Sequence, residues 1–351
     1  MKHKLLIISA VTLLVMACGG GGGGSAPVAS SYIAGVTVDD STTPTKLYIS
    51  DFGLSVVKSV DITSGISTII AGKSGVSGAL NNVTGTSATF FGVEGLALSG
   101  TNLYTVDALN CGVRNISTTA PYAVTTLAGN LGVNCSNTDN AVGASATFNL
   151  PRNATVDRIT GDLYVTDSVN NSIRKITPAG VVTTIVSGFN NPFGIVSDNA
   201  SPPILYVTDQ GNNSIKKVAY SGGAWGVTLF AGSSTNAAGL PTNANGTSAT
   251  FNAPQGITID STFTNLYVVD ALNNAVRKIV IAAPQAVSLI AGSGAGTPGS
   301  ANNSTGTSAT FNSPMSITYG GGNLYITDQN GTTLRVIGVT GTNAVTNLTI
   351  N

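Results

Sequence analysis

The chain has 351 residues, of which only 9% are charged and 42% are hydrophobic, and 15 basic residues balance 15 acidic ones. This low, balanced charge argues against nucleic-acid binding, which depends on clustered lysines and arginines that release counterions. The apolar fraction is ample for a buried core. Because few residues are charged, the chain is kept soluble mainly by the hydroxyl and amide groups of its many Ser, Thr and Asn residues, and it is also rich in glycine, with 43.

The first residues have the pattern of an export signal. Lys2 and Lys4 precede an apolar run from Leu5 to Ala17 that is too short to span a bilayer comfortably. We therefore assign residues 1–17 to a signal peptide and exclude them from the fold. Its removal also removes the only histidine, His3, and two of the 15 basic residues, which leaves 13 basic and 15 acidic residues.

The apolar run ends in Val15-Met16-Ala17-Cys18, which resembles the lipobox of bacterial lipoproteins. The resemblance implies that Cys18 is acylated and becomes the new N-terminus, although Met16 stands where that family prefers Ser, Ala or Thr. An ordinary signal peptide that is cut elsewhere is the alternative. Residues 18–31, rich in Gly and Ser, are then a flexible tether.

Gly19, where some lipoproteins carry Asp, resembles the pattern that sorts such proteins to the outer membrane. The expected location is therefore the bacterial cell envelope, on the periplasmic side of the outer membrane or on the cell surface. Membrane contact is expected through the N-terminal lipid only.

From residue 32 onward the chain repeats one phrase, best seen in Leu163–Ile176. Its aspartate and a basic residue seven positions later recur six times, at Asp51 and Lys58, Asp107 and Arg114, Asp167 and Arg174, Asp209 and Lys216, Asp270 and Arg277, and Asp328 and Arg335. A second phrase, Thr-Ser-Ala-Thr-Phe, stands at residues 86–90, 247–251 and 307–311, with a variant at 144–148. The chain is therefore an array of six similar units.

Each unit predicts four short strands, here called a to d, bounded by turn residues. In the fifth unit they are Gly256–Asp260, Asn265–Asp270, Ala275–Ile279 and Ala286–Gly292. Units of roughly 42 to 61 residues with four strands each are typical of propeller blades. The sequence thus predicts an all-β fold over residues 32–351, a six-bladed β-propeller of four-stranded antiparallel blades.

Several phrases of the fifth unit carry a family resemblance: Phe251-Asn-Ala-Pro254-Gln-Gly256, Leu266-Tyr-Val-Val-Asp270 and Asn273-Asn-Ala-Val-Arg277. They look like the NHL repeat, and the likeness covers nearly all of the chain after the tether. It implies the propeller fold but no single function, because NHL propellers include binding scaffolds, RNA binders and an amidating lyase. Since Tyr32–Asp39 supplies the first strand a and Val345–Ile350 the last strand d, we expect blade 1 to close the ring by packing on blade 6.

The repeated charges are expected to be structural. Each aspartate ends a strand b, where its carboxylate can accept backbone N–H bonds in the turn, although a metal or catalytic ring is the alternative. The basic residues on strand c are expected on an exposed face of the sheet. No cofactor is expected, and neither a metal site nor catalytic residues are assigned, since the propeller has no histidine to ligate zinc or to activate a nucleophile.

Antiparallel blades place the b–c turns and the d–a loops on one face, which we expect to be the working surface. The long d–a loops are residues 73–89, 130–147, 233–250 and 293–310; where one is missing, at Gly188-Phe189, a notch is expected between blades 3 and 4. Cys111 lies in a b–c turn and Cys135 in the next d–a loop. We predict a disulfide between them, in preference to a free thiol.

One variable position lies just before each strand a, where the chain turns toward the channel. It holds Ala34, Glu94, Arg152, Phe193, Gln255 and Met315. We hypothesise that Glu94, Arg152, Phe193, Gln255 and Met315 contact a ligand at the channel mouth and that Glu94 pairs with Arg152. The alternative is that these side chains only plug the channel.

The favoured function is that of a non-enzymatic binding module for a protein, peptide or glycan, and the chain is expected to be monomeric. The alternative is a lyase or lactonase of the propeller type with its site at the channel mouth, although the propeller lacks histidine. A structural protein that self-assembles through the edge strand Val345–Ile350 is a third possibility.

Overall fold

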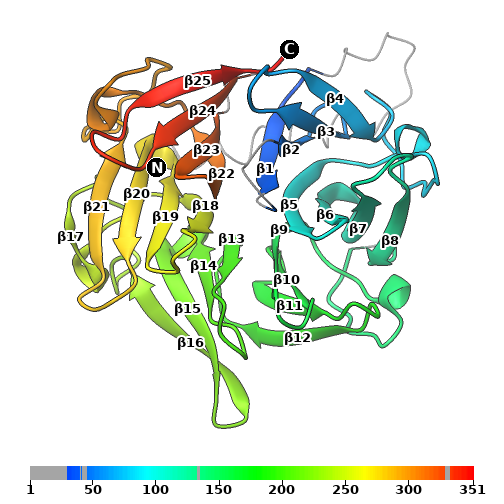
Figure 1. Ribbon diagram of the computed structural model, residues 1–351. Coiled ribbons are helices and arrows are strands. Elements are labelled where there is room, and N and C mark those ends of the chain that lie inside the picture. Colours follow the sequence, from blue (N-terminus) through cyan, green and yellow to red (C-terminus); the bar gives the residue numbers. More distant parts are fainter. Residues whose placement is uncertain (1–29, 40, 42–45, 133–134, 329–332) are drawn as a thin grey trace, which may run out of the picture.

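The structure is a computed structural model and describes residues 30–39, 41, 46–132, 135–328 and 333–351. Cys18, the signal peptide and nearly all of the tether lie outside the described residues, so their assignments stay predictions. Six four-stranded antiparallel units surround a central axis, as Figure 1 shows, and they confirm the six-bladed β-propeller. Among the described residues, no helix has the length and apolar character that crossing a membrane requires.

The strands of the first three blades run outward from the axis in chain order. Blade 1 comprises β1 (Ile33–Asp39), β2 (Lys46–Asp51), β3 (Val56–Asp61) and β4 (Ser67–Ala71). Blade 2 comprises β5 (Val93–Ser99), β6 (Asn102–Asp107), β7 (Gly112–Ser117) and β8 (Val124–Ala128). Blade 3 comprises β9 (Pro151–Val156), β10 (Leu163–Asp167), β11 (Ser172–Ile176) and β12 (Val182–Ser187).

The second half repeats this order. Blade 4 comprises β13 (Pro192–Ser197), β14 (Leu205–Asp209), β15 (Ser214–Ser221) and β16 (Ala224–Ala231). Blade 5 comprises β18 (Pro254–Ile259), β19 (Asn265–Asp270), β20 (Ala275–Val280) and β21 (Ala286–Ala291), to which the short β17 (Ala244–Asn245) adds a fifth strand. Blade 6 comprises β22 (Pro314–Gly320), β23 (Asn323–Asp328), β24 (Thr333–Gly338) and β25 (Val345–Thr349).

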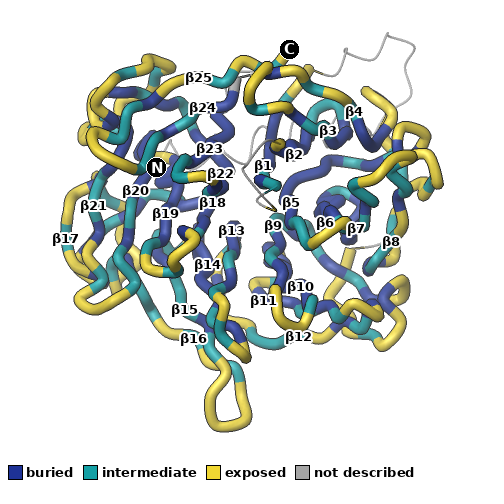
Figure 2. The backbone as a smooth tube through the Cα atoms, in the orientation of Figure 1, coloured by how far each residue is buried: buried dark blue, intermediate teal, exposed yellow. Residues whose placement is uncertain are grey.

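The core lies between neighbouring blades rather than within one. A tyrosine on strand b of each blade faces an aliphatic residue on strand a of the next; Tyr206 and Ile257, for example, share one buried cluster. Short side chains let the inner strands converge: a Cβ added at Gly35 would lie 2.2 Å from the Glu94 carbonyl oxygen of blade 2. The inner strands can therefore approach the axis closely, and Figure 2 shows them as largely buried.

The ring closes as expected, with β1 packed on β22 and the two blades in separate sheets. The chain end adds a link: the Ser67 N–H and Oγ–H both donate to the Asn351 carbonyl, at 3.0 and 2.7 Å, and the Asn351 N–H donates to the Gly65 carbonyl. Asn303 of the preceding loop pairs with Val345 at the start of the outer edge of β25; self-assembly through this strand stays a hypothesis.

The long d–a loops are not free on the working face. Each folds back along the outer edge of the next blade and pairs with its strand d, and each contains a 3₁₀ turn: η1 (Gly85–Ser87), η3 (Gly143–Ser145), η5 (Gly246–Ser248) or η7 (Gly306–Ser308). The chain then re-enters the seam between blades through the buried phenylalanine of the second phrase. Much of each loop thus protects a sheet edge.

The connection from blade 3 to blade 4 does not leave an open notch along its inner part. Phe189 is buried there in a cluster with Tyr164 and Ile195, and Trp225 and Val227 pack against that cluster. Only the outer rim differs: no arriving loop pairs with β16, although β12 and η5 contact it, and its hairpin with β15 projects from the ring at the bottom of Figure 1.

Candidate functional site

The basic residues of strand c are not on an exposed face, which corrects the expectation from sequence. The arginines at positions 114, 174, 277 and 335 are at most 2% exposed and pair with the aspartate of the adjacent strand b. Each also stacks on the phenylalanine of the second phrase; Arg114, for example, lies 4.9 Å above the ring of Phe90. In blades 1, 2, 3, 5 and 6 the spacing of seven therefore marks an ion pair, and with arginine this pair is interior.

The aspartates hold this pair in place from several sides. The Asp167 carboxylate accepts the Asn149 N–H at 2.7 Å, the Asn170 side-chain amide at 2.8 Å and the Arg174 guanidinium at 2.8 Å. In blades 2 to 6 a backbone donor comes from the segment before strand a. Among blades 1 to 5, whose b–c turns the structure describes, Asp51 also accepts a turn N–H, from Leu54. These carboxylates are structural, as expected, with partly different donors.

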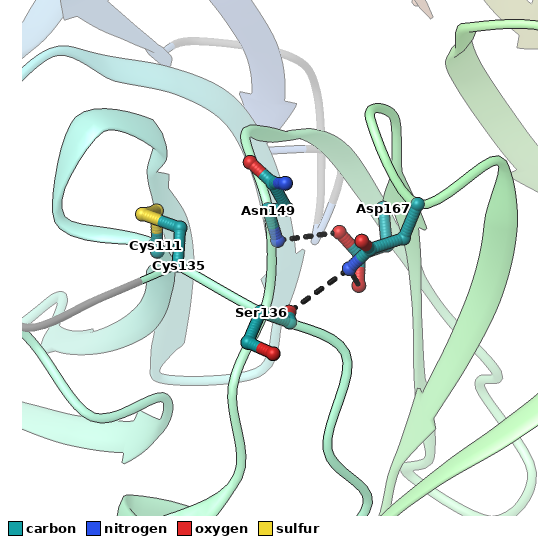
Figure 3. Close-up of a disulfide and its surroundings, with 6 residues drawn as sticks. Cys111, Cys135, Ser136, Asn149 and Asp167 are labelled. Carbon is teal, nitrogen blue, oxygen red and sulfur yellow. Dashed lines mark hydrogen bonds between the residues drawn. A yellow bond between two sulfur atoms is a disulfide. The ribbon is translucent and has the colours of Figure 1, made fainter.

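The disulfide predicted between Cys111 and Cys135 is present, with the two Cα atoms 5.7 Å apart. Cys111 has φ = 57°, the left-handed conformation that Asn171, Asn213 and Asn274 adopt at the equivalent turn. Figure 3 shows that the loop after the disulfide continues to Ser136, whose carbonyl accepts the Asn170 side-chain amide. The covalent link thus joins the b–c turn of blade 2 to the loop leading to blade 3.

The variable positions lie not before strand a, as predicted, but at its second residue in every blade, because each strand a starts earlier than the sequence suggested. Several of these side chains come together at one end of the channel. Ala34, Phe193 and Met315 form a buried cluster with Phe52, and Tyr32 packs against it. We call this group the channel plug, together with the residues that flank it, Glu94, Arg152 and Gln255. The Tyr32 hydroxyl donates to the Met315 sulfur at 3.3 Å.

Some polar atoms of the plug have a partner and others do not. Arg152 forms an ion pair with Glu94, as hypothesised, and its guanidinium lies 5.6 Å from the ring centroid of Phe193. Burial raises the pKa of Glu94, while the charge of Arg152 opposes that shift. Glu94 Oε2, Arg152 Nε and Gln255 Oε1 are buried without a hydrogen-bond partner. Ligand contact at these residues stays a prediction.

Beyond the plug the channel widens into a cavity of about 540 Å³. The innermost strand of every blade lines it, and so do turns between strands a and b, including the exposed Arg158, Asn199 and Ser261. The cavity therefore opens on the face of the a–b turns. The sequence placed the working surface on the opposite face, where the plug lies.

The cavity wall is rich in hydrogen-bonding groups. Each innermost strand is a sheet edge, so backbone N–H and C=O groups on its inner side are not used by its own sheet. Hydroxyls from neighbouring blades satisfy some of them: Ser316 Oγ accepts the Val36 N–H at 3.3 Å, and Thr258 Oγ1 accepts the Tyr319 N–H at 3.2 Å. A hydroxyl has one donor and two acceptor sites, so capacity for a ligand is left.

Two aromatic rings complete the lining on one side. Phe263 in the a–b turn of blade 5 and Tyr319 on β22 are both partly exposed to the cavity. Tyr319 is fixed by stacking on Tyr267, with the two rings 3° from parallel and their centroids 6.2 Å apart. The cavity thus combines aromatic faces with hydroxyl and backbone groups.

The carboxylates near the cavity mouth serve the turns. Asp157 accepts the Ile159 N–H at 2.8 Å, and Asp198 accepts the Ile204 N–H at 2.8 Å. Asp260 accepts bonds from the Thr264 backbone and the Asn265 side chain, and its pKa is lowered by them despite partial burial. Within the described part of the chain, no three His, Cys, Asp or Glu side chains are grouped as metal ligands.

Sequence reasoning missed the cavity lining. The available signal was the threonine at the centre of four strands a, at positions 37, 155, 258 and 318, in a place where most strands of this chain carry aliphatic residues. Phe263 gave no signal, because a–b turns differ in length from blade to blade and its φ of 56° is visible only in the structure.

Comparison with known proteins supports the fold and leaves the function open. No family model and no curated protein matches the chain, so the NHL resemblance stays a prediction. A solved protein of unknown function from Bacteroides thetaiotaomicron is 19% identical with a TM-score of 0.64, over 93% of this chain and 71% of that one.

Two further solved structures carry functional names. An auxiliary nutrient binding protein from Bacteroides ovatus is 17% identical with a TM-score of 0.64, over 90% of this chain and 70% of that one. A virginiamycin B lyase from Staphylococcus aureus is 17% identical with a TM-score of 0.54, over 93% of this chain and 86% of that one. At such identities the likeness concerns the fold alone.

Proposed function

We propose that this protein is a non-enzymatic binding module that takes an uncharged, hydroxyl-rich ligand of the carbohydrate class in its central cavity. The observation that carries the proposal is the cavity of about 540 Å³, which hydroxyls and backbone edges line from all six blades and which Phe263 and Tyr319 flank. Specific polar groups beside apolar and aromatic surface are the usual composition of a small-molecule site. A sugar offers both hydroxyls and a ring face.

The chemistry of the lining favours binding over catalysis. Asp157, Asp198 and Asp260 accept hydrogen bonds from turn residues, which supports a structural role for them. The names of similar structures include both a nutrient binding protein and a lyase, and at 17% identity they do not choose between the two. The choice rests on the cavity.

The proposal includes the anchored location expected from the sequence. Cys18 would carry the lipid, and the protein would face the periplasm or the exterior from a bacterial outer membrane. Incorporation of labelled fatty acid into the wild type but not into Cys18→Ala would support this assignment. At that location the protein would meet nutrient glycans and glycans of the cell envelope, and these are the proposed ligands.

Glycan-array screening of the detergent-solubilised full-length protein, followed by calorimetry on the hits, tests the proposal. Phe263→Asn removes the aromatic ring while keeping a residue that tolerates positive φ, and it should weaken binding about tenfold, as expected for one lost aromatic contact. Leu240→Ala, at an exposed position on a d–a loop, is the control and should bind as the wild type does.

A plug variant separates the two candidate positions for the ligand. Glu94→Gln should leave affinity unchanged if the plug only closes the channel. A loss with Glu94→Gln but not with Phe263→Asn would move the ligand to the residues hypothesised from the sequence. No glycan binding by the wild type would refute the carbohydrate assignment.

A further inference from the structure

The outer edge of blade 4 differs from that of the other blades. In blades 2, 3, 5 and 6 the arriving loop pairs antiparallel with strand d, on Val124, Val182, Val287 and Val345, which are at most 2% exposed. Blade 1 receives the chain end on Ser67 instead. Val227, the equivalent residue of blade 4, is partly exposed, since Gly188-Phe189 provides no loop.

The covering loops share one recognition group. In each loop, the residue that pairs with strand d follows an Asp or Asn. The side-chain oxygen of this Asp or Asn accepts a hydrogen bond from the buried arginine of strand c, from an outward-facing N–H of strand d, or from both. Asp139 accepts Arg174 Nη2 at 2.7 Å and the Thr184 N–H at 2.9 Å. Asn81 and Asn302 accept the arginine of their blades, and Asn243 accepts the Leu289 N–H at 2.7 Å.

Blade 4 lacks the loop with its Asp or Asn but has the groups that such a loop would contact. Lys216 takes the place of the arginine and stands opposite Leu229, as Arg174 stands opposite Thr184 in blade 3. Burial raises the pKa of Asp209, and hydrogen bonds from Asn190 and Asn212 and then the charge of Lys216 oppose that rise. By the shared register, the N–H groups of Val227 and Leu229 point to the outer side. A cation and an unshared strand edge thus remain where the other blades receive an Asp or Asn.

The surroundings of β16 are occupied on the side of blade 3 and open at the hairpin tip: β12 contacts β16, and Ile185 and Val186 pack in the same cluster as Trp225 and Val227. β15 and β16 extend to eight residues each, and the space around Gly222 and Gly223 at their tip is open. Figure 2 shows the tip of this hairpin as exposed. Trp225, the only tryptophan of the chain, lies two residues from Val227 and contacts Tyr220, with 5.4 Å between ring centroids.

We propose that the outer edge of β16 binds an extended segment of a partner polypeptide that carries Asp or Asn. The segment would run antiparallel to β16, pair with Val227 and place its carboxylate or amide oxygen between Lys216 and the Leu229 N–H. The argument for this occupant is internal: four other blades hold a segment of this chemistry in the same register. Strand addition to a free edge is an established mode of peptide recognition. The inference does not depend on the ligand of the cavity.

A peptide with the sequence of residues 137–145 is the probe, because it contains the Asp139-Asn140 pair and no aromatic residue. Added to the full-length protein in detergent, it should change the fluorescence of Trp225 in a saturable way. The same peptide with Asp139→Lys should bind at least about tenfold more weakly, because it places a cation against Lys216. The protein variant Lys216→Glu should reverse this preference, and Lys217→Glu should keep the wild-type affinity.

Three outcomes would overturn the proposal. They are no saturable change up to about 1 mM peptide, equal affinity for the Asp and Lys peptides, and self-association of the protein through β16 that the peptide fails to disrupt in sedimentation experiments. If Lys216→Glu does not fold, the comparison of the two peptides on the wild-type protein still decides.

Discussion

At the scale of single residues, this propeller buries charge in most of its blades. An arginine in a dry interior carries a large desolvation cost, which is offset only if a counter-charge and further hydrogen bonds are present. Arg277 has these: Asp270 Oδ2 at 3.3 Å, the Thr250 carbonyl at 3.1 Å and the Thr242 carbonyl at 2.5 Å. The arginine therefore ties strand b, strand c and the covering loop into one unit.

Replacing this arginine should be costly. Arg277→Met should lower the free energy of unfolding by about 3–5 kcal/mol, because it leaves the buried Asp270 carboxylate without its counter-charge. Arg277→Lys should cost less, about 1–2 kcal/mol, since the charge stays and some hydrogen bonds are lost. Urea unfolding of both variants measures these losses. Lys278 is partly exposed, so Lys278→Ala serves as the control and should change the free energy of unfolding by less than about 0.5 kcal/mol. Equal losses for Met and Lys would show that the charge is unimportant.

The same pairs predict how stability depends on pH. Burial raises the pKa of Asp107 and Asp270 to about 6, although their arginines and hydrogen bonds oppose the shift. In the unfolded chain a carboxyl titrates near pH 4. Between about pH 4 and 6 the folded protein therefore binds more protons than the unfolded chain, so these groups make the free energy of unfolding decrease as pH rises.

We accordingly expect the protein to resist urea better at pH 5 than at pH 7. Glu94, Asp167 and Asp209 contribute in the same direction, because burial raises their pKa values too. Asp270→Asn should reduce the difference between the two pH values, since it removes one of the titrating groups. A wild type that becomes more stable from pH 5 to pH 7 would contradict this interpretation.

At the scale of elements, the periodic part of the sequence was enough to predict the strands. Turn residues and alternating apolar residues recur at fixed offsets, so strand b ends at the predicted aspartate in all six blades. The disulfide was also predictable, because Cys111 replaces a turn asparagine and the topology brings the following loop to the same face. Local patterns thus gave the blades and one covalent link between elements.

The path of the loops was not predictable, and it changed the meaning of the basic residues. A polar loop such as residues 73–89 has no apolar period, so nothing in it indicated that Asn82 would pair with Val124. Without that covering segment, Arg114 would lie near the solvent, as the sequence suggested. The cavity was hidden for a similar reason, because its wall is made largely of backbone edges that leave no trace in side-chain patterns.

At the scale of the whole molecule, the chain enters on one face and the cavity opens on the other. The Ser31 hydroxyl donates to Asp51 at 2.6 Å, and the Ser30 carbonyl lies against Gly53, so the start of the propeller is fixed beside a b–c turn and the plug. The cavity mouth is formed by a–b turns at the far ends of the inner strands. A lipid on Cys18 would therefore hold the plug face toward the membrane.

The length of the tether makes this orientation testable. If residues 19–30 form the tether expected from the sequence, these twelve residues would span at most about 40 Å when extended and about 20 Å on average as a Gly- and Ser-rich linker. On vesicles that carry spin-labelled lipids, a fluorophore at Val169→Cys on the b–c face should be quenched, while one at Asn199→Cys on the cavity rim should not. Both positions are exposed, and Cys111 and Cys135 are blocked by their disulfide.

The matched control carries Cys18→Ala in addition and should show no quenching at either position, because it has no anchor. Equal quenching at both positions in the acylated protein would mean that the propeller tumbles freely or lies on its side. Selective quenching at position 169 would instead mean that the tether presents the cavity mouth to the solvent. A ligand that arrives from outside the membrane could then reach the hydroxyl-lined wall without any rearrangement of the plug.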